Sequence, residues 1–218
     1  MVVNGVVAIV AGYLLGSIPT AYIAARLIKG KDIRQLGGGN IGARNAFHEV
    51  GAAAGIAVGI FDAGKGVAAV AIAYWLLGAP QLWLLGMPQL FLLAAGLAAV
   101  AGHIWSIYLK FTGGNGLATT MGVLAFLMTQ EFLIALAITL VLVVITRNPV
   151  LSVNISFLLS VPVSAWFVEK SWLAVVFSVA LALILVIHFI PTAKAAVVKA
   201  GSRENLSAEL LRRDKVNK

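Results

Sequence analysis

The chain has 218 residues, of which 61% are hydrophobic and only 11% are charged. Soluble domains keep about a quarter of their residues charged, so this composition excludes an ordinary soluble protein and predicts an integral membrane protein. The formal net charge of +8 does not indicate nucleic-acid binding, because the basic residues lie in short segments beside apolar stretches, as the positive-inside rule and contact with anionic lipid head groups require.

Apolar segments predict an all-α bundle of seven transmembrane helices. In chain order they cover residues 2–25, 52–77, 90–109, 117–128, 132–146, 150–168 and 172–190. A spanning helix needs about 20 residues, so the fourth and fifth segments are short, and they could instead form one helix interrupted at Gln130 and Glu131. With seven spans and an outer N-terminus, every Lys and Arg except Lys65 and Lys170 lies on the inner side. We therefore expect a cytoplasmic C-terminus and two short helices around a cytoplasm-facing cavity.

The charge pattern also divides the chain. We expect a seven-helix membrane domain over residues 1–193 and a basic cytoplasmic tail over residues 194–218. In the tail, Leu206, Leu210 and Leu211 recur at helical spacing, which predicts a helix that lies on the membrane surface or in solvent.

A glycine-rich segment, GGGNIGARN, follows the first apolar stretch at residues 37–45 and is called here the first glycine loop. Glycines let backbone N–H groups converge on an anion, and Arg34 or Arg44 would add positive charge. The alternative is a flexible inner loop whose basic residues only set the topology. The spacing does not match G-x-x-x-x-G-K-[ST] and no strand precedes it, which excludes a nucleotide P-loop.

A second glycine segment, GGNG at residues 113–116, follows the third apolar stretch and is called the second glycine loop. Asp62 and Lys65 are three residues apart in an apolar segment, so they share a helix face and can pair, with Lys65 either lining a cavity or serving structure only. His103 precedes the second loop, where it could be a general base, a hydrogen-bonding group or a packing residue. His188 ends the last apolar segment and could reach the same interface.

Familiar catalytic motifs are missing from the sequence. It has no cysteine and no G-x-S-x-G, and no histidine is followed by Asp five positions later, which excludes the His-x4-Asp signature of common acyltransferases. Its three histidines lack carboxylates at metal-ligand spacing, so no metal site is expected. Group transfer would then depend on positioning and on charge stabilisation of a reactive donor.

The chain resembles the bacterial acyl-phosphate-dependent glycerol-3-phosphate acyltransferases in three collinear segments: GSIPTAYIAARLIKGKDIRQLGGGNIGARN, FDAGKG and GHIWSIYLKFTGGNGLATTMG. The resemblance implies acyl transfer from acyl phosphate to the 1-hydroxyl of sn-glycerol 3-phosphate, forming lysophosphatidic acid for phospholipid synthesis at the bacterial inner membrane. It implies no cofactor, metal or protein nucleophile. The expected partners are these two substrates and membrane phospholipids, not nucleic acid, with the protein a monomer or weak homo-oligomer. One alternative is a non-catalytic or altered-acceptor paralogue that binds lipid or phosphate. A small-solute transporter is the less favoured alternative.

Site residues also follow from the resemblance. It assigns catalytic roles to His188 and His103. It assigns substrate binding to the two loops and their surroundings: Gly38, Gly39, Asn40, Arg44, Asn45, His48, Lys65, Gly113, Gly114, Asn115, Gly116 and Thr119. The chain departs from the family pattern at several of its motif positions, which hold Gly38 for serine, Arg44 for threonine, His48 for arginine, and Thr112 and Asn115 for lysines. We expect Arg44 to replace part of the missing positive charge.

Overall fold

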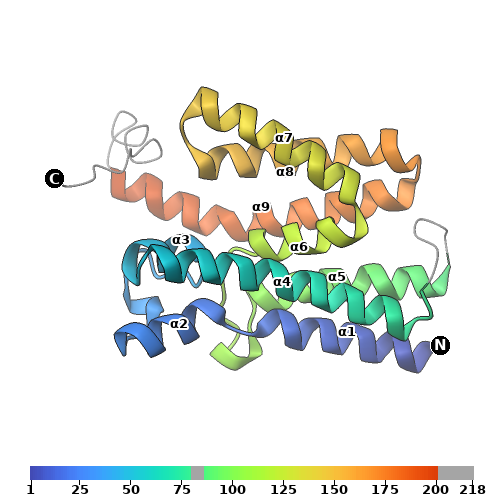
Figure 1. The fold of residues 1–218 in the computed structure, drawn as a ribbon, viewed down its shortest axis with the longest axis horizontal. Helices are drawn as coiled ribbons and strands as arrows, with labels where there is room; N and C mark the ends of the chain where they lie inside the picture. The colour runs from blue at the N-terminus through green and yellow to red at the C-terminus, as the bar shows by residue number, and fades with distance from the viewer. Residues whose placement is uncertain (80–85, 201–218) are drawn as a thin grey trace.

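A computed structural model describes residues 1–79 and 86–200, and within these residues the chain is helical with no strand (Figure 1). The elements in chain order are α1 (Val2–Ser17), α2 (Thr20–Lys29), the 3-10 turn η1 (Ile33–Gln35), α3 (Ala43–Glu49), α4 (Ala52–Leu76), α5 (Met87–Ile104), the 3-10 turn η2 (Ile107–Leu109), α6 (Leu117–Leu127), α7 (Thr129–Thr146), α8 (Pro149–Glu169) and α9 (Trp172–Ala200).

Six described segments are long and apolar enough to cross a membrane, which confirms a multi-pass membrane protein. They are Val2–Lys29, Ala52–Leu76, Met87–Leu109, Thr129–Thr146, Leu151–Glu169 and Trp172–Phe189. The remaining apolar helix, α6, has 11 residues and at about 1.5 Å per residue covers only part of a bilayer. The seventh span therefore stays a prediction that depends on α6.

The first apolar segment is not one continuous helix, as we had predicted for residues 2–25. It breaks at Ile18 and Pro19, between the end of α1 at Ser17 and the start of α2 at Thr20. Proline has no N–H to continue the helical hydrogen bonds, and the carbonyl of Ile18 accepts a hydrogen bond from the buried Lys65 side chain instead. The break therefore leaves backbone carbonyls inside the bundle that can accept hydrogen bonds from side chains.

The fourth and fifth apolar segments form separate helices, so the alternative of one long helix is wrong. Met128, fully buried with φ −136° and ψ 59°, divides α6 from α7. Because α7 begins at Thr129 and has 18 residues, only α6 is short. At the other end of the chain, α9 continues to Ala200 and so crosses the expected boundary at residue 193. The predicted tail helix around Leu206 lies outside the described residues.

Glycines bring α1 and α5 into close contact along their length. A side chain added at Gly12 or Gly16 of α1 would overlap backbone carbonyls of α5, and one at Gly102 of α5 would overlap the carbonyl of Tyr13. Small residues at such interfaces let membrane helices approach backbone to backbone. The packing fixes the end of α5, where His103 lies, against the α1–α2 break.

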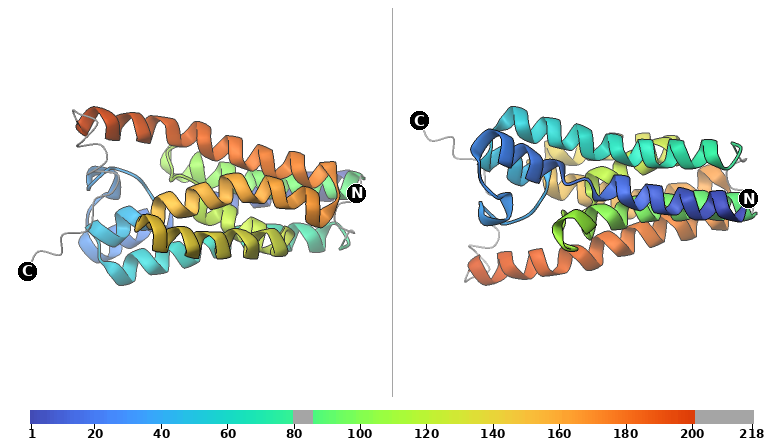
Figure 2. Two further views of the ribbon diagram at one scale, coloured as in Figure 1. Left: turned by 90° about the horizontal axis from the view of Figure 1, so that it is seen from above. Right: turned by 90° about the horizontal axis from the view of Figure 1, so that it is seen from below.

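A similar contact joins α4 to α6. Gly66 of α4 packs against the carbonyl of Thr119, and Gly122 of α6 packs against the carbonyl of Ala63, with no room for a side chain at either glycine. The start of α6, which follows the second glycine loop, is thereby fixed against α4. Both loops lie toward the end of the bundle opposite the N-terminus, where Figures 1 and 2 show α2 and α3.

Candidate functional site

Asn45, in the first turn of α3, organises the first glycine loop. Its side-chain nitrogen donates to three backbone carbonyls of the loop and the segment before it: those of Asn40 at 2.9 Å, Leu36 at 3.1 Å and Ile33 at 3.4 Å. Its side-chain oxygen accepts from the N–H of Gly38 at 3.4 Å. One amide thus folds the loop back on itself, while the substrate-binding role expected of Asn45 stays a prediction.

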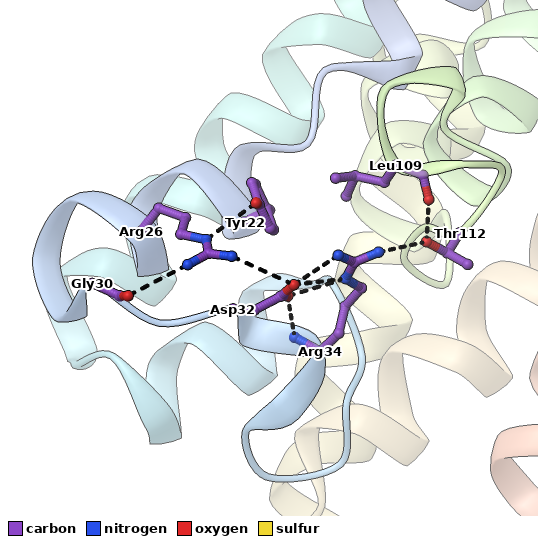
Figure 3. A network of polar contacts seen from close by, with 7 residues as sticks. All are labelled: Tyr22, Arg26, Gly30, Asp32, Arg34, Leu109 and Thr112. Atoms are coloured by element: carbon purple, nitrogen blue, oxygen red, sulfur yellow. Dashed lines mark hydrogen bonds and ion pairs between the residues drawn. The ribbon is translucent and has the colours of Figure 1, made fainter.

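A polar network joins the segment before the first loop to the segment before the second (Figure 3). Asp32 accepts hydrogen bonds from the backbone and the guanidinium of Arg34, the shortest at 2.7 Å, and Arg26 lies 3.9 Å away. Arg34 also reaches the hydroxyl of Thr112 at 3.5 Å, and both guanidinium groups lie over the Tyr22 ring. The hydrogen bonds from Arg34 hold the pKa of Asp32 below its ordinary value of 3.8, although burial opposes this, and Asp32 raises the pKa of Arg34. Arg34 is therefore largely committed to Asp32.

The two glycine loops meet at Gly114. Its N–H donates to the carbonyl of His103 at 3.1 Å, and an added side chain would overlap the His103 ring on one side and the Ile41 carbonyl of the first loop on the other. Gly113 packs equally closely against the carbonyls of His103 and Ile104. Only glycine fits at these positions, because backbone from three segments converges there.

Gly116 ends the second loop and begins α6. Its φ of 82° lies in the left-handed region that favours glycine, and the first free N–H groups of α6 follow it. Leu185 of α9 lies beside Gly116, with its Cδ2 atom 3.2 Å from where a Cβ would be. One turn further along α9, the half-buried His188 ring packs edge-on against Trp105 at a centroid distance of 6.0 Å. The last helix thus brings His188 toward the second loop.

Beneath the loops lies a buried cluster of ionisable side chains, Asp62, Lys65 and His103, which is called here the buried cluster. The Lys65 ammonium lies 2.8 Å from the Asp62 carboxylate, which confirms the pairing predicted from their spacing. Thr20 donates to the same carboxylate oxygen at 2.6 Å, and His103 Nδ1 lies 3.6 Å from it. The three side chains line a cavity of about 10 Å³ together with residues of both loops and the α1–α2 break.

This cavity is lined by the α1–α2 break, α4, the end of α5 and the loops. A second cavity of similar volume is lined by α6, α8 and α9, so one of the two helices expected to be short lines a cavity, and its facing the cytoplasm stays a prediction. A drug-sized ligand pocket typically has several hundred Å³. The cavity of about 10 Å³ is far smaller, and the buried cluster forms its floor beneath the loops.

The remaining predicted site residues are distributed unevenly. Gly39, Asn40 and Asn115 lie partly exposed in the loops, and Gly38 is exposed with open space around its Cα. Arg44 and His48 are exposed on α3, away from the floor. Thr119 is fully buried in the contact between α6 and α4, and its hydroxyl has no hydrogen-bond partner within the described residues. The structure therefore brings the glycines and Asn45 together, with Arg44 and His48 exposed on α3 beside them.

Four polar groups at the site were not predicted. They are the carbonyls of Ser17 and Ile18 and the hydroxyls of Thr20 and Ser106, with the Ser106 hydroxyl donating to the Ser17 carbonyl. All belong to the α1–α2 break or face it. Pro19 was the one signal in the sequence that indicated a break, since a proline inside a spanning helix frees carbonyls for other donors.

Comparisons with known proteins agree on one family. The sequence model described as glycerol-3-phosphate acyltransferase matches residues 6–197. Glycerol-3-phosphate acyltransferase 2 of Dehalococcoides mccartyi (strain ATCC BAA-2266) is 43% identical over 200 residues, covering 90% of this chain and 89% of the relative. The enzyme of Thermosynechococcus vestitus is 36% identical, covering 82% and 84%. The crystal structure of the integral membrane glycerol 3-phosphate acyltransferase PlsY, in its glycerol 3-phosphate form, matches with a TM-score of 0.76 and 25% identity over 89% of this chain and 92% of that one.

Proposed function

The chain belongs to the glycerol-3-phosphate acyltransferase family, and we propose that its two glycine loops perform the family's acyl transfer with an acyl phosphate as the donor. The protein is an acyltransferase of phospholipid synthesis. The reaction proposed for it joins the 1-hydroxyl oxygen of sn-glycerol 3-phosphate to the acyl carbon and breaks the bond between that carbon and the phosphate oxygen. Lysophosphatidic acid and inorganic phosphate are the products.

The meeting of the two loops at Gly114 carries this proposal. Both substrates are phosphate esters or anhydrides, so the site needs donors for two phosphates close together. The N–H groups at the start of α6 supply such donors, together with those of the first loop beyond Gly38 and Gly39, whose own N–H groups bond within the protein, and a helix N-terminus attracts anions. Arg44 adds an exposed cation next to the first loop. The loops bind and orient the two phosphates, which brings the hydroxyl to the acyl carbon.

Charge stabilisation explains how acyl transfer takes place without a protein nucleophile. Negative charge grows on the acyl oxygen and on the departing phosphate, and preorganised N–H donors stabilise it. The proton of the attacking hydroxyl passes to the departing phosphate. His188 is the histidine best placed to hydrogen-bond the acceptor, because it is half-buried on the face of α9 that passes the second loop.

The orientation follows from charge. In this proposal the loops face the cytoplasm at the bacterial inner membrane, the N-terminus lies outside, and α6 counts as the seventh span. The basic residues around the loops support it, since Arg26, Lys29, Lys31, Arg44 and Lys110 are all exposed at or near this end of the bundle. The stretch 194–218, which carries seven of the 16 Lys and Arg residues, is the cytoplasmic tail in this proposal. The protein acts as a monomer or weak homo-oligomer beside phospholipid.

Phosphate release by the purified protein in detergent tests the reaction. Palmitoyl phosphate is supplied with and without glycerol 3-phosphate, and lysophosphatidic acid is measured by mass spectrometry. We expect release that depends on the acceptor and equals the product formed. Acceptor-independent release, or none beside an active relative, would overturn the proposal in favour of a non-catalytic or altered-acceptor paralogue.

A matched pair of variants tests the role of the loops. Gly114→Leu inserts a side chain where the two loops meet and should abolish product formation. Gly64→Leu places the same side chain on α4 at an exposed position with open space around it and should leave activity unchanged. Activity in Gly114→Leu comparable with that of the control would refute the role of the loops.

A further inference from the structure

The buried cluster contains more charge than a membrane bundle needs for packing. Asp62, Lys65 and His103 are at most 8% exposed, and they lie at the floor of the site. Taking ions out of water costs several kcal/mol each, so an apolar set of the same volume would serve packing at least as well. Such clusters occur where function requires a defined geometry. The family's reaction as proposed above gives them no direct role.

The contacts of the cluster connect the α1–α2 break, α2, α4 and α5. Lys65 donates to the Ile18 carbonyl at 2.8 Å, which holds the α1–α2 break. Asp62 accepts from Thr20 in the first turn of α2 and from Lys65 in α4. It is also the charged group nearest to His103 Nδ1, at 3.6 Å. One carboxylate therefore connects α2, α4 and the end of α5.

His103, which faces Asp62, also contacts Gly114 of the second glycine loop. Its carbonyl accepts the N–H of Gly114, and its Nε2 edge lies against the Gly114 Cα on the side where a Cβ would point. The opposite neighbour of Gly114 is the carbonyl of Ile41 in the first loop. The His103 ring thus supports the junction of the two loops from below, while Asp62 lies at the other edge of the ring.

We infer that His103 and Asp62 are positioning residues that set the separation of the two glycine loops, and through it the spacing of the two phosphates. This inference rests on the proposed function of the loops. His103 acts through Gly114 and does not exchange a proton with substrate, because it is 6% exposed and its Nε2 edge is covered by the loop. The catalytic role that the resemblance assigns to His103 is replaced by this one.

Two variants of His103 separate positioning from proton transfer. His103→Ala removes the support under Gly114, so KM for glycerol 3-phosphate should rise about tenfold or more, while kcat falls less than about threefold. His103→Gln places an amide near the Nε2 position and cannot titrate. It should restore KM to within about threefold of wild type and keep the pH–rate profile. A general base would instead lose about 10²–10⁴-fold in kcat in both variants, with loss of one limb of that profile.

The cluster itself is tested with a charge-neutral pair of substitutions. Asp62→Ala alone would leave Lys65 buried without its carboxylate and endanger folding. The double variant Asp62→Ala with Lys65→Met removes both charges together. It should reproduce the KM increase of His103→Ala, because the His103 ring loses its contact with the Asp62 carboxylate. A double variant that folds and has wild-type KM would exclude Asp62 from the mechanism of positioning.

Binding measured without turnover distinguishes this inference from the proposed function. Thermal shift of the full-length protein in detergent is recorded with glycerol 3-phosphate and, separately, with inorganic phosphate. We expect wild type and His103→Gln to be stabilised and His103→Ala to need about tenfold more of either anion. Binding that follows this order without product formation would overturn the proposed reaction and support the inference. Equal binding by all three proteins would overturn the inference, and no binding by wild type would overturn both.

Discussion

The substitution Asn45→Ala should disable the first glycine loop while leaving the bundle folded. The two N–H groups of this side chain are shared among three carbonyls at 2.9, 3.1 and 3.4 Å. Each net hydrogen bond contributes about 0.5–1.5 kcal/mol, so two donors contribute about 1–3 kcal/mol. Because Asn45 is only half-buried and the carbonyls can rehydrate, about 2 kcal/mol is a reasonable value. That corresponds to about a thirtyfold loss in the population of the ordered loop.

KM for glycerol 3-phosphate and thermal unfolding in detergent measure this effect. We expect KM to rise about ten- to thirtyfold, with little change in the unfolding midpoint, because the larger hydrophobic core cluster of the bundle contains no residue of the loop. The control is Asn4→Ala, which removes one side-chain hydrogen bond, to the Leu76 carbonyl at 3.1 Å, between the far ends of α1 and α4. It should leave KM unchanged. A KM within threefold of wild type in Asn45→Ala would refute the reasoning.

Three further changes follow from the structure. Gly122→Ala should destabilise the bundle by about 1–3 kcal/mol through overpacking against the α4 backbone, measured as a lower unfolding midpoint than that of Gly64→Ala, where space is open. The carboxylate of Asp32, whose pKa is lowered by Arg34, stabilises the folded protein through Arg34 and Arg26 above about pH 4. This stabilisation is lost as pH falls through the folded-state pKa, below 3.8, so Asp32→Asn should reduce the acid sensitivity of the unfolding midpoint in that range. Glu131→Met should raise stability by about 1–3 kcal/mol, because this fully buried carboxyl has no hydrogen-bond partner among the described residues, and a lower midpoint would contradict that.

Much of the architecture could be predicted because membrane helices are encoded locally. Composition alone predicts a membrane protein, and apolar segments predict most helices within a few residues, as for α4, expected at residues 52–77 and found at Ala52–Leu76. The errors occur where tertiary contacts compete with helix propagation. The break before α2 depends on Pro19, which cannot continue the helix, and on the buried Lys65 ammonium, which donates a hydrogen bond to the carbonyl of Ile18.

The candidate site was predictable in part for the same reason. The two glycine loops stand out because clustered glycines allow positive φ and close backbone approach whatever surrounds them. The role of Asn45 was also accessible, since its partners lie within 12 residues of it. By contrast, the sequence does not show that Arg44 and His48 are exposed on α3, which depends on how this short helix packs against α4, and their binding of substrate stays a prediction.

The sequence by itself determined the membrane class, the glycine loops and the pairing of Asp62 with Lys65, because an i, i+3 spacing puts two side chains on one helix face whatever surrounds the helix. Only the tertiary structure decided that Thr20 and His103 face the same carboxylate. These residues are about 40 positions from Asp62 on either side, and no local rule relates them. Their meeting requires α1, α4 and α5 to pack closely, which depends on the summed contacts of many small residues and not on any one motif.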